Sequence, residues 1–221
     1  MEIKVLKNVM IKNSAVGNDN RRLFNSKGVL AVNIVSSPGA GKTTLLENSL
    51  GLIASKYKSA VIEGDLYTSR DAERLQKFNI PIVQINTEGG CHLDARMISG
   101  ALKEFDIDKV DVVFIENVGN LVCPSAFDLG EQTRVLVYAI TEGADKPQKY
   151  ATMFKTANVV LVNKTDLAQI CDVDLLAVEQ EIKELNPQAL ILRISANNSN
   201  TLKDWICWLE GKIESSKKSK N

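Results

Sequence analysis

The chain has 221 residues, enough for one domain of ordinary size with a continuous core. Its 27 Lys and Arg residues balance its 27 Asp and Glu residues, so its charge gives no reason to expect a nucleic-acid or anionic-membrane partner. No segment is apolar over the length of a membrane span, and the N-terminus lacks the apolar stretch of a signal peptide, so we expect a cytoplasmic protein.

Three segments are distinguished along the chain. Residues 1–27 form an N-terminal arm, predicted to be an amphipathic helix that breaks near Gly17 and Asn18. Residues 28–214 alternate apolar runs of strand length with helical patterns, and residues 215–221 form a basic, frayed C-terminal tail. The predicted strands are Val29–Val35, Ala60–Ile62, Ile80–Ile85, Val110–Ile115, Val135–Ile140, Val159–Val162 and Ala189–Ile194. The predicted helices are Thr43–Ser55, Ser69–Phe78, Leu93–Phe105, Asp172–Leu185 and Leu202–Ile213.

This alternation predicts an α/β fold. Several of the strands are apolar at nearly every position, which is typical of a parallel sheet that is covered on both faces. We therefore expect one doubly wound domain, with a mostly parallel sheet of about seven strands and helices on both faces. Ligands of such sheets bind beyond the carboxyl ends of the strands, where the functional residues should lie.

The segment Ser36–Thr43 follows the first predicted strand and leads into a helix. It matches the phosphate-binding P-loop pattern, with Ser36 in place of the first glycine. Glycines let consecutive backbone N–H groups turn toward a phosphate, the lysine supplies a catalytic positive charge, and the threonine hydroxyl ligates Mg²⁺. The alternative is a flexible turn before a helix, but the buried strand before it favours a P-loop. The predicted nucleotide-binding residues here are Gly39, Ala40, Gly41, Lys42, Thr43 and Thr44.

A second motif, Asn163-Lys164-Thr165-Asp166, ends the strand at Val162. The carboxylate of Asp166 can accept hydrogen bonds from N1–H and the 2-amino group of guanine, which adenine lacks. The stem of Lys164 can lie along the base, and Asn163 can brace neighbouring loops. Backbone N–H groups at Ser195 and Ala196, after the last strand, can meet the guanine oxygen. The alternative is an ordinary polar turn; the position at a strand end favours a guanine site.

Two acidic residues follow other strands at the same expected edge. Asp65 and Glu116, with Thr43, are the predicted Mg²⁺ ligands, and together with Lys42 the two carboxylates are the predicted catalytic residues. Gly119 can offer its N–H to the γ-phosphate. Arg70-Asp71 is either a loop that orders on GTP or a solvated first helical turn. No arginine is identified as a built-in catalytic finger, so we expect slow intrinsic GTP hydrolysis.

Cys91 and His92 follow the strand Ile80–Ile85, and Cys123 follows the strand Val110–Ile115. If these strands lie close together in the sheet, the three side chains converge. Thiolate and imidazole ligands suit Ni²⁺, Zn²⁺ or Cu⁺ rather than Mg²⁺.

Three ligands do not close a tetrahedral site, so a water or a second subunit would complete it. Because Cys123 comes four positions after Gly119, nucleotide state can open or close the metal shell. The alternative is that these cysteines are buried apolar side chains, as we interpret Cys171 and Cys207.

Taken together, these motifs resemble the HypB family of hydrogenase-maturation GTPases over about residues 20 to 210. The resemblance rests on Ser36–Thr44, Glu63-Gly64-Asp65 with Arg70-Asp71-Ala72, Cys91-His92-Leu93-Asp94-Ala95, Glu116–Pro124 with Phe127-Asp128-Leu129-Gly130, and Asn163–Asp166. It implies a GTP-bound homodimer that delivers nickel to the large subunit of [NiFe]-hydrogenase, with a HypA-like zinc protein as its companion. It also implies Mg²⁺ with GTP, and Ni²⁺ or Zn²⁺ at an interface site formed by Cys91, His92 and Cys123. The family's Mg²⁺ and phosphate roles map onto Lys42, Thr43, Asp65 and Glu116.

The sequence departs from some family members. It has neither an N-terminal Cys-x-x-Cys-Gly-Cys motif nor a His-rich stretch, since His92 is its only histidine. The resemblance therefore implies no separate high-affinity nickel site. Three alternatives stay open: a urease-maturation GTPase, whose Cys-Pro-His metal motif is missing here, a metal-storage module with a structural nucleotide, and a signalling GTPase without a metal role.

Overall fold

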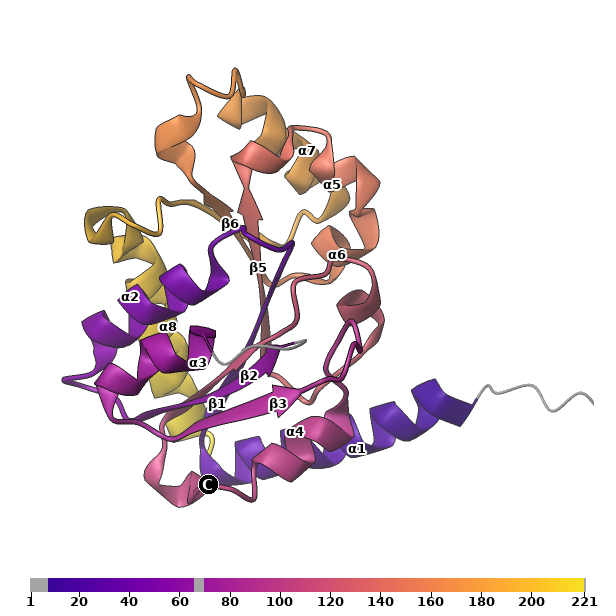
Figure 1. The fold of residues 1–221 in the computed structure, drawn as a ribbon, viewed down its shortest axis with the longest axis vertical. Coiled ribbons are helices and arrows are strands. Elements are labelled where there is room, and N and C mark those ends of the chain that lie inside the picture. The colour runs from indigo at the N-terminus through magenta and orange to yellow at the C-terminus, as the bar shows by residue number, and fades with distance from the viewer. Residues whose placement is uncertain (1–7, 66–69, 221) are drawn as a thin grey trace, which may run out of the picture.

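A sheet of seven parallel strands forms the centre of the computed structural model, which describes residues 8–65 and 70–220 (Figure 1). The strand order is β3-β2-β4-β1-β5-β6-β7. All seven predicted strands are confirmed, with small differences at their ends. The strands are β1 (Leu30–Ser36), β2 (Ser59–Asp65), β3 (Ile82–Asn86), β4 (Val112–Glu116), β5 (Thr133–Ala139), β6 (Val159–Asn163) and β7 (Leu190–Arg193).

Helices cover both faces of the sheet, as predicted (Figure 1). One face packs on α2 (Lys42–Ile53), α3 (Arg70–Leu75) and α8 (Lys203–Lys218). The other packs on α1 (Asn8–Lys27), α4 (Ala95–Ala101), α5 (Lys146–Lys149), α6 (Ala151–Thr156) and α7 (Leu175–Leu185). Because both faces are covered, β1, β4, β5 and β6 are buried along their whole length. The apolar runs in the sequence reflect this double burial.

The N-terminal helix differs from the prediction. We expected a break near Gly17 and Asn18, but α1 continues through both residues, so that prediction is wrong. A glycine inside a helix costs only about 1 kcal/mol relative to alanine. Here it also has a packing role, because a Cβ atom at Gly17 would lie 2.9 Å from the carbonyl oxygen of Asp128. The glycine lets α1 pack directly against the chain at Asp128. The expected arm also includes residues 1–7, which lie outside the described residues.

The C-terminal helix is longer than predicted. It was expected to end at Ile213, before a frayed tail, but α8 continues to Lys218. Lys217 Nζ pairs with Asp111 Oδ1 at 2.9 Å, which ties the last turn to the segment before β4. The short helices α5 and α6 were not predicted, because a helix of a few residues is too short to display a helical period.

The topology places one crevice at the centre of the sheet. From β1 the chain runs to β2 and β3 on one side, returns to β4 beside β1, and continues to β5, β6 and β7 on the other side, so the strand order reverses at β1. Ligands of doubly wound sheets bind at such a point, beyond the carboxyl ends of the strands. Within the described ranges, no helix has both the length and the apolar character needed to cross a membrane.

Candidate functional site

The P-loop joins β1 to α2 at the centre of this edge. Gly39 and Gly41 have φ values of 73° and 102°, in the left-handed region that favours glycine. A Cβ atom at Gly41 would also lie 2.6 Å from Asn163 Nδ2. Glycine at position 41 is therefore required both for the turn of the loop and for the close approach of Asn163.

Asn163 braces the P-loop against the segment after β7. Its Nδ2 donates to the carbonyl oxygen of Ala40 at 2.7 Å, and its Oδ1 accepts from the N–H of Ala196 at 2.8 Å. Lys164 lies above the same loop and donates from Nζ to the carbonyl oxygen of Gly39 at 2.9 Å. These contacts are the bracing role expected for Asn163, and they join the phosphate and base motifs into one unit.

A cavity of about 360 Å³ opens between these motifs. Asp166 lies on its wall, where Asp166 Oδ1 accepts a hydrogen bond from the Ser195 hydroxyl at 2.5 Å. The backbone N–H of Asp166 donates to the same hydroxyl oxygen at 3.2 Å, so the carboxylate is held in place before any base binds. The lining residues are Gly39, Gly41, Thr44, Asn163, Lys164, Asp166, Leu167, Ser195, Ala196 and Asn197. Leu167 and Asn197 were not singled out from the sequence.

The expected magnesium ligands lie at the adjacent strand ends. The Thr43 hydroxyl donates to Glu116 Oε1 at 2.7 Å, and both side chains are buried. Glu63 of β2 pairs in register with Glu116 of β4, and Asp65 is the last residue of β2, at the same edge. Lys42 Nζ lies 3.2 Å from Ser36 Oγ, within the loop itself. Hydroxyl and carboxylate oxygens at one edge of a sheet are ligands that suit Mg²⁺. The side chains of Arg70 and Asp71, the weaker candidates, lie outside the described residues.

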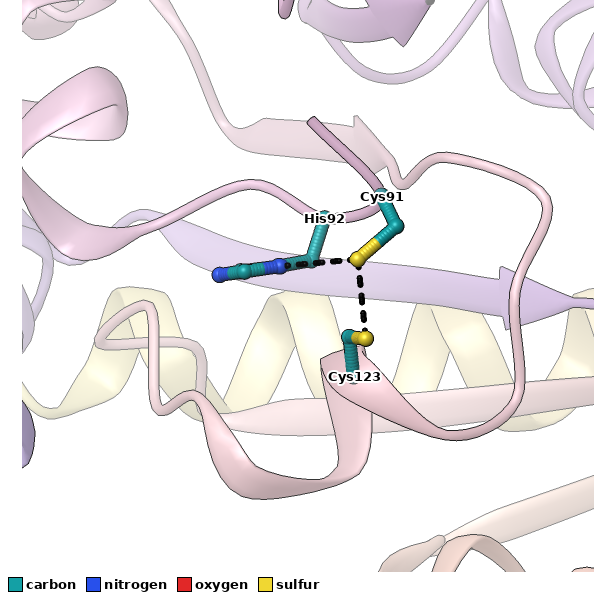
Figure 2. A group of neighbouring side chains, drawn as sticks. All are labelled: Cys91, His92 and Cys123. Carbon is teal, nitrogen blue, oxygen red and sulfur yellow. Dashed lines mark hydrogen bonds between the residues drawn. The ribbon is translucent and has the colours of Figure 1, made fainter. Parts of the chain in front are cut away.

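The three thiol and imidazole side chains meet beside this edge (Figure 2). The ligand atoms of Cys91, His92 and Cys123 all lie within 4.8 Å of one another. Cys91 Sγ is 2.8 Å from Cys123 Sγ and 3.5 Å from His92 Nδ1. The strands that precede them, β3 and β4, are separated by β2, so the loops after these strands converge across the end of β2.

The other two cysteines do not join this group. Cys171 is half-buried, whereas Cys207 is exposed, so the interpretation of Cys207 as a packed core residue is wrong. The helix α8 buries Trp205, Leu209 and Ile213, which repeat every four residues, and Cys207 lies off that stripe.

Local electrostatics favour the uncharged forms of Cys91 and His92. The hydrogen bond with Cys123, together with burial, raises the pKa of the Cys91 thiol. Burial lowers the pKa of His92, which favours the neutral imidazole, the form with a lone pair for a metal. A bound metal ion would displace the thiol protons, since the thiolate is the ligand.

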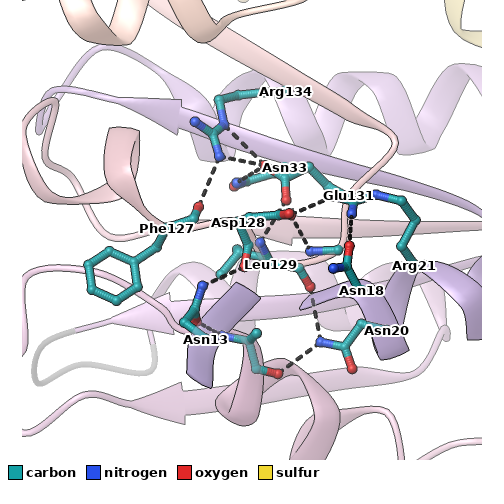
Figure 3. Close-up of polar contacts among 12 residues, drawn as sticks. Asn13, Asn18, Asn20, Arg21, Asn33, Phe127, Asp128, Leu129, Glu131 and Arg134 are labelled. Atoms are coloured by element: carbon teal, nitrogen blue, oxygen red, sulfur yellow. Dashed lines mark hydrogen bonds and ion pairs between the residues drawn. The ribbon is translucent and has the colours of Figure 1, made fainter. Parts of the chain in front are cut away.

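A buried polar network behind the cluster supports the Cys123 loop (Figure 3). Arg134 pairs with Glu131 at 2.7 Å and donates to the carbonyl oxygen of Phe127 at 2.9 Å. Glu131 also accepts from Asn33 Nδ2 of β1 at 3.1 Å. Phe127 in turn lies against His92, so the network positions one of the three candidate ligands. Asn33, Glu131 and Arg134 were not singled out from the sequence, and Phe127 was named only as part of the family resemblance.

Asn117 and Asn120 connect the two cysteine-bearing segments and were also missed. Asn117, which follows Glu116 directly, is buried and accepts at Oδ1 from the N–H of Leu93 at 3.2 Å. Asn120 Nδ2 donates to the carbonyl oxygen of Cys91 at 3.2 Å. Both asparagines lie in the segment Glu116–Pro124, which was named from the sequence only as part of the family resemblance. No local pattern in the sequence indicated that they would bond to Leu93 and Cys91.

The same loop also touches the P-loop. A Cβ atom at Gly119 would lie 3.0 Å from Cα of Pro38, so the absence of a side chain lets the two loops approach closely. The phosphate loop, the Glu116–Gly119 segment and the cysteine loops therefore form one continuous set of contacts.

Comparisons with known proteins agree with one another. The CobW/HypB/UreG nucleotide-binding domain matches residues 30–193. A hydrogenase maturation factor HypB from Azotobacter vinelandii is 43% identical over 208 residues, which cover 94% of this chain and 69% of that protein. The crystal structure of HypB from Archaeoglobus fulgidus superposes with a TM-score of 0.86 at 36% identity, covering 92% of this chain and 99% of that one. That of HypB from Helicobacter pylori in complex with nickel gives a TM-score of 0.86 at 38% identity, covering 92% and 96%.

Proposed function

The chain belongs to the HypB group of the CobW/HypB/UreG family, and on that premise we propose that it is a GTPase that delivers nickel during hydrogenase maturation. In this proposal the nucleotide occupies the cavity beside Asp166, and nickel is a cargo held by Cys91, His92 and Cys123. Nucleotide state determines whether the cargo is held or released.

One observation carries the proposal: a continuous route joins the phosphate loop to the cysteines. Thr43 bonds to Glu116, Asn117 is the next residue, and Asn117 accepts from the N–H of Leu93, which follows His92. A Mg²⁺ ion that binds with GTP would be coordinated by the Thr43 hydroxyl. This coordination would compete with the hydrogen bond from the hydroxyl to Glu116. The end of β4 would shift, and Asn117 would carry that shift to the cysteine segment.

The predicted chemistry of hydrolysis depends mainly on positioning and charge. Lys42 would neutralise the transferred phosphoryl group, and Asp166 would select guanine over adenine. Thr43, Glu116 and Asp65 would hold Mg²⁺, which stabilises the negative charge that develops on the phosphates. Since no arginine was identified as a built-in finger, intrinsic turnover would be slow, as befits a switch.

The metal site is suited to transfer rather than permanent storage. Three protein ligands leave one tetrahedral position open, and an open position allows an ion to be exchanged. A two-fold related copy could complete the shell, which would link metal binding to a GTP-dependent homodimer. The HypB structure from Helicobacter pylori is described as a complex with nickel, which supports nickel here, although Zn²⁺ accepts the same ligands. The proposed partners are the hydrogenase large subunit and a HypA-like zinc protein.

The test combines metal stoichiometry with subunit mass. Binding of Ni²⁺ and Zn²⁺ would be measured by calorimetry, with GDP and with a non-hydrolysable GTP analogue, for the wild type, Cys91→Ala and Cys123→Ala. Cys207→Ala is the matched control, because that cysteine is exposed and lies outside the cluster. We expect a GTP-dependent dimer and nucleotide-dependent metal binding that either cluster variant abolishes. If metal binding depends on neither the nucleotide nor the cysteines, the protein would be a GTPase without a role as a nickel carrier.

A further inference from the structure

The helix α1 lies against the start of α4 and the 128–130 segment, which follow the candidate metal ligands in the chain. Figure 3 shows Asn13 and Asn20 of α1 at these contacts. Asn20, which is buried, donates from Nδ2 to the carbonyl oxygen of Ala95 at 2.8 Å and to that of Leu129 at 3.0 Å. Ala95 begins α4, three positions after His92, and Leu129 lies six positions after Cys123. One buried amide group therefore bridges the two segments on which the ligands are carried.

Asn13 makes a second bridge between the same segments. Its Oδ1 accepts from the N–H of Ala95 at 2.8 Å, and its Nδ2 donates to the carbonyl oxygen of Asp128 at 2.8 Å. Asn13 and Asn20 are seven positions apart, two helical turns, so both amides project from one face of α1. The partners of both asparagines are backbone groups. An apolar side chain at position 13 or 20 would leave these groups without their hydrogen bonds.

The backbones of α1 and the 128–130 segment are also in direct contact. A Cβ atom at Gly130 would lie 2.5 Å from the carbonyl oxygen of Gly17, and one at Gly17 would lie 2.9 Å from that of Asp128. Arg21 and Asp128 add an ion pair at 2.5 Å on the half-exposed rim. Two glycines, two buried amides and an ion pair thus fix the position of this segment against the helix.

We propose that α1 acts as a clasp that pre-organises the cysteine and histidine ligands, with Asn13 and Asn20 as positioning residues for metal binding. The inference rests on the proposed metal role of Cys91, His92 and Cys123. Groups that hold metal ligands in place without touching the metal contribute about 10- to 100-fold to affinity in other metal sites. Here the clasp holds the backbone of both loops. Phe127 is next to Asp128 in the chain, so the position of Asp128 affects the Phe127 ring, which packs against His92.

The clasp should be separable from nucleotide binding. The matched nucleotide-binding domain begins at residue 30, after α1 ends at Lys27. The P-loop, the base cavity and the Asn163 braces involve none of the clasp residues. A change in the clasp is therefore expected to alter metal affinity while GDP affinity stays nearly constant, which a general loss of stability would not do.

The experiment compares Ni²⁺ affinity and GDP affinity in the full chain. Asn20→Ala removes both carbonyl contacts, and Arg22→Ala is the control, because Arg22 pairs only with Asp19 on the exposed side of the same helix in the described structure. We expect Asn20→Ala to raise the Kd for Ni²⁺ about 10-fold and to weaken the sulfur-to-nickel charge-transfer absorption. The Kd for a fluorescent GDP analogue should change less than twofold in both variants.

Variants at two other positions of α1 keep the test informative should Asn20→Ala fail to fold. Asn13→Asp keeps the acceptor for Ala95 and loses the donor to Asp128, whereas Asn13→Ala loses both contacts. Gly17→Ala forces α1 away from Asp128. We expect Asn13→Ala and Asn13→Asp both to raise the Kd for Ni²⁺, since the Asp carboxylate would face the carbonyl oxygen of Asp128 with no proton to donate, and Gly17→Ala to raise it as well.

Two results would overturn the clasp. The first is a Kd for Ni²⁺ within twofold of wild type in the folded variants, and the second is a parallel loss of GDP affinity. The failure of the metal site itself is distinguishable, because the wild type would then bind Ni²⁺ no better than Cys91→Ala does.

Discussion

The ring of His92 lies against the ring of Phe127, with centroids 3.9 Å apart and an angle of 34° between their planes. Phe127 therefore shields one face of the imidazole and limits its rotation. Arg134 donates a hydrogen bond to the carbonyl oxygen of Phe127, so the Phe127 ring is positioned by the buried network as well as by local packing.

The first prediction concerns this contact. Phe127→Ala should weaken Ni²⁺ binding several-fold, because the imidazole loses the surface that fixes its orientation, in line with the roughly 10-fold effects of groups that support metal ligands. Phe127→Leu keeps most of the apolar volume and serves as the control. Competition with a chelator would measure both affinities. Equal affinities for Phe127→Ala and wild type would mean that the stack has no role in metal binding.

The second prediction concerns base selection. Asp166→Asn replaces an acceptor-only carboxylate with an amide, which no longer pairs with two donors on guanine. Hydrogen bonds to charged groups contribute about 1.5–3 kcal/mol, so GTP affinity should fall at least 10-fold. Affinity for a xanthine nucleotide, which has a carbonyl in place of the 2-amino group, should rise. Equilibrium titration with both nucleotides checks this exchange, and unchanged GTP affinity would place the base elsewhere.

The third prediction concerns coupling between the two sites. Asn117→Ala removes the bond to the N–H of Leu93, so the ratio of Ni²⁺ dissociation constants with GDP and with a GTP analogue should move toward one. By linkage, the effect of Ni²⁺ on nucleotide affinity should shrink by the same factor. Both ratios are measurable by calorimetry on the purified protein. A variant with full coupling would exclude this route and leave the Gly119–Pro38 contact as the connection.

The fourth prediction concerns acid stability. Burial alone would raise the pKa of Asp128, but hydrogen bonds from Arg21 and from the N–H of Gly130, together with charge attraction, lower it below its ordinary value of 3.8. A carboxyl group with a lowered folded-state pKa contributes stability above its unfolded-state pKa and loses it as pH falls through the folded value.

Asp128→Asn should therefore reduce the free energy of unfolding near neutral pH. The difference from wild type should shrink as pH falls below about 4. Urea unfolding at several pH values measures it, with Asp19→Asn, at an exposed position of α1, as the control. A difference that stays constant with pH would show that the charge of Asp128 contributes no stability.

Local patterns in the sequence determined the seven strands and the chemistry at their ends. Strands buried on both faces must be apolar along their length, so β1, β4, β5 and β6 were visible as continuous apolar runs. The P-loop and the Asn163–Asp166 motif were visible because their functional groups are neighbours in the chain.

Only the tertiary structure decided how the cysteine-bearing loops are held. Cys91 and Cys123 meet across the end of β2, and Asn13 reaches Asp128 over 115 positions of chain. A buried asparagine with two backbone partners has the same side chain as one exposed in a turn, so the sequence could not distinguish Asn13, Asn20 or Asn117 from surface residues. For the same reason Gly17 was mistaken for a helix break, since its role is to admit the backbone of a distant segment.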